Sequence, residues 1–156
     1  MGVEVLRAGG NAIDAAIAAN AALGVVEPMM CGIGGDLMAM VWDARSQHLH
    51  GYNGSGRSPA ALTLDRFRER SLVHIPAGDP LTWTVPGCVE GWARLLERFG
   101  TKSLDELVAP AIRLAEEGCA VPKVIAATWA SSASALWEEG RRVFMPHGSA
   151  PRAGEV

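Results

Sequence analysis

The sequence has few cysteines, and their spacing argues against the sites that cysteines most often build. Cys31, Cys88 and Cys119 are an odd number and contain no Cys-x-x-Cys pair. A disulfide scaffold needs an even set at close spacing, and a zinc site needs paired ligands. None of the four histidines lies in a recognisable catalytic pattern that would activate a cysteine. We therefore expect three reduced thiols, no metal site and no cofactor.

Clustered positive charge and long apolar runs are also missing. The formal net charge is −3 and the basic residues are scattered, which argues against a nucleic-acid partner. No segment approaches the roughly 18 uncharged apolar residues of a membrane span. The first residues, MGVEVLRAGGN, carry a charge at Glu4 and lack the apolar core of a secretory signal. These absences predict neither nucleic acid nor membrane as a partner, and they favour a cytoplasmic location.

What is present is the composition of a packed globular protein. Hydrophobic residues make up 49% of the chain and charged residues 20%. A length of 156 residues suits one domain or a part of a larger one. No internal repeat or linker divides the sequence. We expect a single partial domain over 1–156, in which 140–156 form an irregular tail without periodicity.

The N-terminal pattern predicts two helices in succession. Residues 2–8 are typical of a helix that ends at Gly9 and Gly10. Asn11 then caps a second helix, with Asp14 three residues later in the capping-box position. This second helix is so rich in alanine that neighbouring elements can approach it from several sides, which predicts a buried helix.

The middle of the chain predicts a hairpin followed by shorter elements. Leu37 to Trp42 is an apolar run of strand length, and Leu49 to Tyr52 returns after the turn residues 43–46. A glycine-rich loop over 53–59 leaves the second strand. Further on, the sequence indicates a short helix at 63–70, a loop at 71–80 and a short strand from Thr82 to Val85.

Three helices are predicted in the remaining sequence. The first has an apolar stripe from Val89 to Phe99, the second is capped by Ser103 with Glu106 in the box position, and the third covers about 122–137. The balance predicts an α+β fold with three or four short strands, too few to form a complete sheet.

The stretch CGIGGDLMAM at 31–40 has glycines that match no complete phosphate-binding pattern. Our preferred interpretation is structural: Gly34 and Gly35 let the chain pass close to a neighbouring layer, because glycine has no side chain. Direct contact with a substrate is the alternative. Asp36 is interpreted as a hydrogen-bond acceptor of a turn or cap more than as a general base.

Several of these motifs together resemble the start of the large subunit of the gamma-glutamyltranspeptidase family. The motifs are GGNAIDAA, GIGGD, VPG followed by GW, and APAIRLAEEG, and the resemblance runs in order over about 2–130. It implies an N-terminal-nucleophile hydrolase, a self-cleaving precursor folded as a four-layer αββα sandwich, of which this chain is an incomplete part. Members of the family usually have a strand and a His-Pro turn before the first helix, so Met1 is interpreted as an internal start.

The resemblance also implies where the chemistry lies. The nucleophile of such an enzyme is the N-terminal threonine of the small subunit, whose own α-amine serves as the base. Backbone amides of that subunit stabilise the oxyanion. We therefore assign no catalytic residue here, expect this chain alone to be inactive, and expect the rest of the precursor as its partner in a heterodimer or (αβ)2 assembly.

The expected substrate-binding residues are Ser55 and Arg57. Classical members carry an arginine in a D-F-R-E-x-A-P segment that binds the α-carboxylate of the gamma-glutamyl group, and alignment on Pro59 places Ser55 at that position. Arg57 lies two residues later, on the same side of an extended loop and roughly 7 Å further along. It could take over carboxylate binding if the loop is rearranged.

Three functions remain open at this point. The chain could belong to a gamma-glutamyl-transferring or glutathione-hydrolysing enzyme. The loop sequence NGSGRSP looks like the amidase and acylase branch of the family, which includes oxamate amidohydrolase and cephalosporin acylases. The third possibility is a non-catalytic interaction module.

Overall fold

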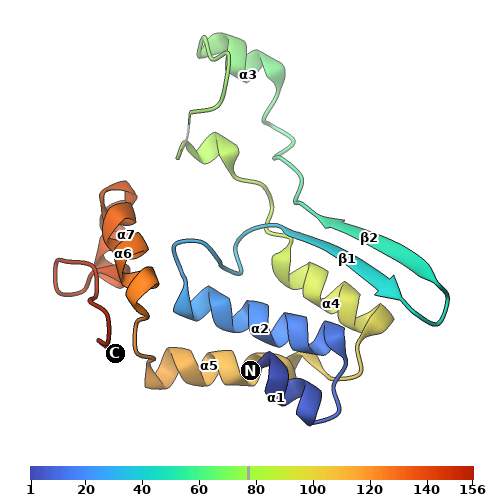
Figure 1. Ribbon diagram of the computed structural model, residues 1–156. Coiled ribbons are helices and arrows are strands. Elements are labelled where there is room, and N and C mark those ends of the chain that lie inside the picture. The colour runs from blue at the N-terminus through green and yellow to red at the C-terminus, as the bar shows by residue number, and fades with distance from the viewer. Residues whose placement is uncertain (77) are drawn as a thin grey trace. The chain divides into compact units, whose positions relative to one another are not determined.

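The structure, a computed structural model, describes residues 1–76 and 78–156. These residues form two compact units: 1–32 together with 95–156, and 33–94. Figure 1 shows the helices and strands of both. Residue 77, in the loop predicted at 71–80, lies outside the described residues.

The first unit begins with the two predicted helices. Helix α1 covers Gly2–Arg7, and Gly9 after it has a φ of 84°, a left-handed conformation that favours glycine. Helix α2 covers Ala12–Val26. The side chain of Asn11 accepts hydrogen bonds from the N–H groups of Ile13 (2.9 Å) and Asp14 (3.1 Å), and Asp14 accepts the N–H of Asn11 (2.8 Å). The predicted capping box is confirmed.

Helix α2 is buried, as its small residues predict. It runs beside helix α5, Leu104–Glu117, and α1 lies next to it (Figure 1). Ala18 of α2 and Leu107 of α5 are almost completely inaccessible to solvent. Short side chains allow the two helix backbones to approach closely and to fill the interface at the density of a protein interior. The buried apolar residues of the two helices are Ala15, Ile17, Ala18, Ala21, Ala22, Leu107 and Ala111.

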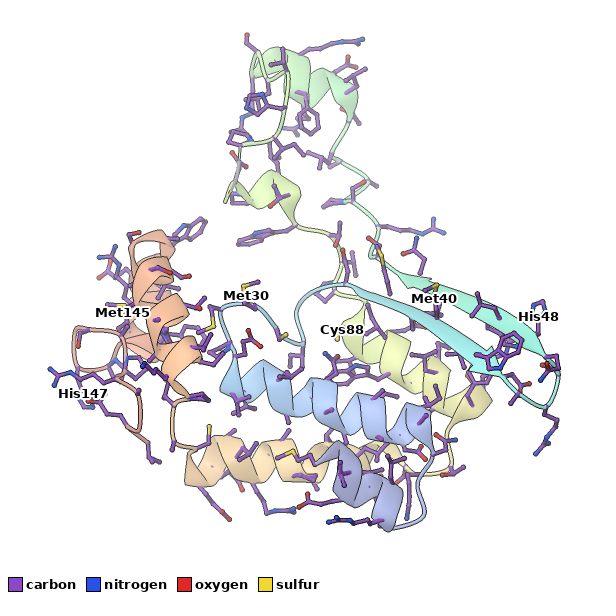
Figure 2. The ribbon with its side chains drawn as sticks, viewed as in Figure 1. Met30, Met40, His48, Cys88, Met145 and His147 are labelled. Carbon is purple, nitrogen blue, oxygen red and sulfur yellow. The ribbon has the colours of Figure 1, made fainter. Side chains whose placement is uncertain are left out.

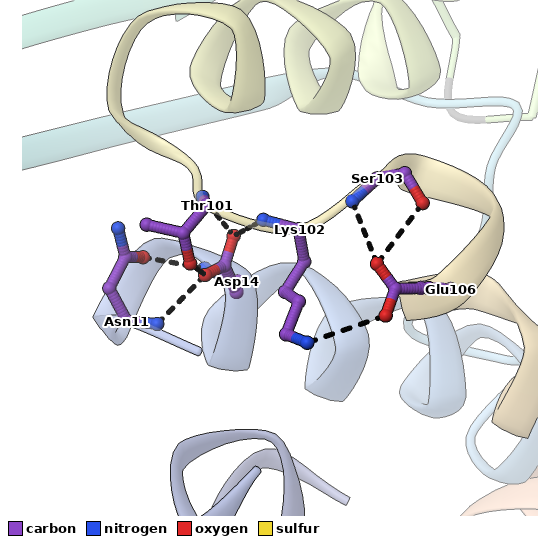
Figure 3. Close-up of polar contacts among 6 residues, drawn as sticks. All are labelled: Asn11, Asp14, Thr101, Lys102, Ser103 and Glu106. Atoms are coloured by element: carbon purple, nitrogen blue, oxygen red, sulfur yellow. Dashed lines mark hydrogen bonds and ion pairs between the residues drawn. The ribbon is translucent and has the colours of Figure 1, made fainter. Parts of the chain in front are cut away.

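The carboxylate of Asp14 joins the start of α2 to the residues that precede α5 (Figure 3). It has 0% exposure and accepts the N–H groups of Thr101 (2.9 Å) and Lys102 (3.2 Å) and the hydroxyl of Thr101 (2.5 Å). Burial by itself raises the pKa of Asp14, but hydrogen bonds from Thr101, Asn11 and Lys102 outweigh it, so the pKa lies below its ordinary value. Asp14 is therefore a buried, ionised and fully hydrogen-bonded centre of this unit.

Helix α5 starts as predicted at Ser103. The carboxylate of Glu106 accepts the N–H and the hydroxyl of Ser103, each at 3.3 Å, and the ammonium of Lys102 at 3.4 Å (Figure 3). These bonds satisfy donors at the helix N-terminus that would otherwise lack partners.

The C-terminal part departs from the prediction. The single helix expected over 122–137 is broken into α6, Lys123–Ser132, and a 3₁₀ turn, η2, Ala133–Ala135. Helix α7 then covers Glu138–Phe144, so the irregular segment begins after this helix and not at 140. Acidic residues in the first turn of α7 and arginines in its last turn match the helix dipole, which explains a helix where no apolar periodicity was found.

The second unit contains the predicted hairpin. Strand β1, Leu37–Asp43, pairs antiparallel with β2, His48–Gly54, with Leu37 opposite Gly54 and Asp43 opposite His48. Asp43 closes the turn by accepting the N–H of Arg45 (2.9 Å) and the hydroxyl of Ser46 (2.6 Å). In Figure 2, His48 lies at this turn and Met40 lies on β1.

Helix α3, Leu64–Glu69, a 3₁₀ turn η1, Pro80–Thr82, and helix α4, Cys88–Phe99, follow the hairpin. The strand predicted from Thr82 to Val85 is wrong. The hydroxyl of Thr82 donates to the backbone oxygen of Asp79 (2.8 Å), which favours the turn. Beyond it, Val85 makes one backbone hydrogen bond, to Arg57 (3.0 Å), and this does not extend into a ladder.

Residues 54–57 and 85–87 approach each other so closely that a side chain does not fit at two glycines. A Cβ on Gly56 would lie 1.6 Å from the carbonyl oxygen of Val85, and a Cβ on Gly87 would lie 2.0 Å from that of Gly54. Glycine is therefore required at both positions for this backbone contact.

The predicted α+β fold is confirmed in its coarse form. Over 1–76 and 78–156 the sheet consists of two strands, β1 and β2, fewer than the three or four expected. None of the described helices is long and apolar enough to cross a membrane.

We expect Asp14→Ala to lower the free energy of unfolding by about 3 kcal/mol, because buried donors lose a charged acceptor. Urea unfolding followed by circular dichroism measures the effect. Asp65→Ala is the matched control: Asp65 is exposed and pairs with Arg68 on the surface, so the change should stay within about 0.5 kcal/mol. Equal losses for the two variants would contradict the role of Asp14.

The pH dependence of Asp14 follows from its lowered pKa. Its stabilisation is fully present above the unfolded value near 3.8 and is lost as the pH falls through the lower folded value. The free energy of unfolding of Asp14→Ala should therefore fall less than that of the unmodified chain on acidification below pH 4.

Gly56→Ala should destabilise the second unit by about 1–3 kcal/mol, because the added methyl group overlaps the carbonyl of Val85. Amide exchange should also accelerate at Val85, whose N–H bonds to Arg57 across this contact. Gly51→Ala provides the control, since a Cβ at Gly51 meets nothing within 4 Å. Unchanged exchange at Val85 in Gly56→Ala would show that the contact is looser than described.

Candidate functional site

The predicted substrate-binding residues lie where three segments of the second unit meet. These segments are the start of β1 at Asp36, the loop 53–59 after β2, and the residues 84–87 that lead into α4. All three belong to the unit formed by residues 33–94.

The carboxylate of Asp36 holds these segments together. One oxygen accepts the N–H of Gly56 (3.2 Å) and the hydroxyl of Thr84 (3.1 Å). The other accepts the hydroxyl of Ser55 (3.1 Å). Asp36 is thus a hydrogen-bond acceptor, but not of a local turn or cap as predicted, because its donors lie 19, 20 and 48 positions away in the chain.

These three donors also fix the charge of Asp36. The N–H of Gly56, and then the hydroxyls of Thr84 and Ser55, lower the pKa of the carboxyl below its ordinary value. Asp36 is therefore ionised at neutral pH. Since the side chain is exposed, this negative charge is accessible from solvent beside the loop.

Ser55 is oriented by its neighbours. Its N–H donates to the side chain of Asn53 (2.9 Å), which is an Asx turn, and its hydroxyl donates to Asp36. A hydroxyl has one proton to donate, so with this bond in place Ser55 offers lone pairs but no donor to a further group.

Arg57 is placed differently. Its backbone oxygen accepts the N–H of Val85, while its side chain is exposed and makes no hydrogen bond or ion pair with any residue that the structure describes. Its guanidinium has five N–H donors in a planar fork suited to a carboxylate. The structure therefore brings Ser55, and not Arg57, to Asp36.

Helix α4 is attached to the hairpin next to this site. The hydroxyl of Tyr52 donates to Glu90, whose other oxygen accepts Nε of Arg94 (2.8 Å). The hydrogen bond from Tyr52 lowers the pKa of Glu90 and raises that of Tyr52. The oxygen of Gly35 also accepts the N–H groups of Gly87 (3.1 Å) and Cys88 (3.0 Å) at the start of α4. Figure 2 shows Cys88 at this helix end.

The structural interpretation of Gly34 and Gly35 is wrong. A Cβ added to either residue would meet nothing within 4 Å, and neither has a left-handed φ. Close packing within this chain therefore does not require glycine at these positions. The alternative, direct contact with a substrate, stays a prediction.

Thr84 is a site residue that the sequence did not reveal. It fell within the strand expected from Thr82 to Val85, and no local pattern connects it with Asp36. The feature of the sequence that could have indicated this contact is its glycines. Gly54, Gly56 and Gly87 lie where two backbone segments approach too closely for a side chain.

The cysteines contribute no visible chemistry. Cys31, Cys88 and Cys119 form no disulfide within the described residues, and Cys88 is buried. In the described part of the chain, no three histidine, cysteine, aspartate or glutamate side chains are grouped in a way that could hold a metal ion.

Comparison with known proteins gives a consistent result. A sequence profile of the family described as Gamma-glutamyltranspeptidase matches residues 1–156. The chain is 36% identical over 161 residues to a glutathione hydrolase proenzyme of Bacillus subtilis (strain 168). The aligned region covers 100% of this chain and 27% of the length of that proenzyme.

Two solved structures resemble the fold. The cephalosporin acylase from Bacillus halodurans superposes with a TM-score of 0.90 at 41% identity, over 99% of this chain and 30% of that one. The gamma-glutamyltranspeptidase of Helicobacter pylori superposes with a TM-score of 0.84 at 32% identity, over 99% of this chain and 46% of that one. Because the family profile covers the whole sequence and the fold agrees, this chain belongs to the gamma-glutamyltranspeptidase family.

Proposed function

We propose that the chain is the N-terminal part of the large subunit of an enzyme that cleaves or transfers an amide-linked acyl group. The observation that carries this proposal is that the chain matches 27% of the length of a glutathione hydrolase proenzyme without leaving any part of itself unmatched. The N-terminal threonine nucleophile and the amides of the oxyanion hole would come from the small subunit, in a heterodimer or (αβ)2 assembly.

The exposed face of the hairpin supports a missing partner. Met38, Met40 and Trp42 alternate along β1 with exposures of 70%, 81% and 57%, whereas Val41 between them is buried. Successive side chains of a strand point to opposite faces, so the three form one apolar face. Exposed apolar surface of this kind marks an interface. We propose that the rest of the precursor covers it and completes the αββα sandwich.

The loop 53–59 is proposed to contact the acyl group of the substrate. Arg57 offers an unpaired guanidinium to a substrate carboxylate, and Ser55 lines the same loop beside Asp36. A gamma-glutamyl substrate suits this arrangement if Arg57 binds its α-carboxylate.

A second candidate is the amidase and acylase branch, whose substrates need no glutamyl group. Two observations favour it: serine at position 55 is bonded to a carboxylate, and the chain is 41% identical to a cephalosporin acylase. The two candidates share the nucleophile and differ in the acyl group.

We expect the complete precursor to cleave itself and then to hydrolyse amides, and the isolated 156-residue chain to show no turnover. Gamma-glutamyl-p-nitroanilide and oxamate serve as substrates, and hydrolysis of oxamate alone would select the amidase branch. A precursor that neither self-cleaves nor hydrolyses any amide would leave the non-catalytic interaction module as the correct description.

Arg57→Ala in the precursor should raise KM for a substrate with a carboxylate about tenfold, because a charge-assisted hydrogen bond is lost. Arg57→Lys should restore part of the loss, since the charge returns without the planar fork. Arg45→Ala, in the hairpin turn, is the control and should leave KM unchanged. An unaltered KM for Arg57→Ala would remove Arg57 from the site.

A further inference from the structure

We infer that Asp36 is a specificity-determining residue, whose negative charge makes the loop select acyl groups that are uncharged or cationic at the end that reaches Ser55. The inference rests on the proposed function, in which the loop 53–59 contacts the acyl group. Asp36 lies outside that loop, and its charge would determine which charge class of acyl group the loop accepts.

The negative charge of Asp36 lies directly beside the loop 53–59. Both oxygens of Asp36 accept hydrogen bonds from or next to the loop: Ser55 Oγ at 3.1 Å, Gly56 N–H at 3.2 Å and Thr84 Oγ1 at 3.1 Å. A group that contacts Ser55 therefore lies within a few ångströms of a carboxylate that is held in place by three donors.

No cation among the described residues forms an ion pair with Asp36 that would compensate its negative charge. The three hydrogen bonds that Asp36 accepts come from neutral donors, and no ion pair of Asp36 occurs within 1–76 and 78–156. Arg57 is roughly 7 Å further along an extended chain. Its charge can bind an anion at its own position, but it does not neutralise Asp36 through an ion pair.

A substrate carboxylate at Ser55 would need a hydrogen-bond donor, which the hydroxyl of Ser55 does not offer. The hydroxyl of Ser55 is already donated to Asp36, so a substrate carboxylate at Ser55 would meet lone pairs and a like charge. A substrate carboxamide or ammonium can instead donate a hydrogen bond to these oxygens. The local electrostatics thus oppose an anion and favour a donor.

The test uses the self-cleaved precursor and two isosteric substrates, 4-carboxybutanoyl-p-nitroanilide, which is anionic, and 4-carbamoylbutanoyl-p-nitroanilide, which is neutral. The measured quantity is the ratio of kcat/KM for the anionic substrate to that for the neutral one. Asp36→Asn keeps the shape of the side chain and removes its charge. We expect the ratio to rise about tenfold, the size of a like-charge contact in a solvated site.

Two control variants separate charge from folding. Asp43→Asn removes the same charge from the hairpin turn and should leave the ratio unchanged. Thr84→Val removes one hydrogen bond to Asp36 but keeps the charge, and it too should leave the ratio unchanged. The Gly56 amide resonance reports whether the loop is intact in each variant.

Salt provides an independent measurement. Raising the ionic strength should shift the ratio further toward the anionic substrate in the unmodified enzyme than in Asp36→Asn, because salt screens exposed charges and Arg57 is present in both. A ratio that is insensitive to Asp36→Asn and to salt, in an enzyme that hydrolyses both substrates, would overturn the inference alone. A precursor without amidase activity would overturn the proposed function and this inference with it.

Discussion

A single exposed carboxylate, Asp36, holds together the segments that form the candidate substrate site. Asp36 accepts three hydrogen bonds that fix the loop after β2 and the segment before α4 at the start of β1. These bonds are stronger while the aspartate is ionised, because hydrogen bonds to a charged acceptor are stronger than those to a neutral one. The glycines at 56 and 87 serve the same contact, since any side chain there would separate the two backbones. Charge, hydrogen bonding and backbone proximity therefore depend on one another at this site.

The unit formed by 1–32 and 95–156 uses a similar device in a different environment. Asp14 is buried, and its oxygens accept backbone N–H groups at two helix starts together with a threonine hydroxyl. The buried carboxylate of Asp14 needs hydrogen bonds to both of its oxygens, because an unpaired buried charge is very costly in free energy. Asp36, by contrast, remains open to solvent, so its lone pairs and charge are available to a ligand. The same residue type thus stabilises one unit from its interior and joins exposed segments in the other.

Local patterns in the sequence predicted local structure well. The capping boxes at Asn11 and Ser103 and the hairpin turn at Asp43 each depend on residues within a few positions. Predictions failed where the deciding partner lies far away in the chain or is absent. Thr82 to Val85 has strand composition, but the backbone N–H groups of Thr82 and Trp83 bond to the local turn, and only the N–H of Val85 bonds to the backbone of a distant described segment, at Arg57. Gly34 and Gly35 have no described neighbour that would require glycine.

The sequence indicated Ser55 and Arg57 as candidate substrate-binding residues and Asp36 as an acceptor, but it did not indicate how they are arranged. The bond between Asp36 and Thr84 crosses 48 positions, and no short pattern encodes it. The resemblance to the family supplied the importance of position 55, while only the structure showed that its hydroxyl is committed to a carboxylate.

A crystal structure of the self-cleaved enzyme, with its acyl group trapped on the nucleophile, would show directly whether the loop 53–59 binds the substrate. We expect the acyl chain to end within hydrogen-bonding distance of the side chains of Asp36, Ser55 or Arg57. An acyl chain that ends elsewhere, with no contact to the loop 53–59, would show that these residues do not form the substrate site.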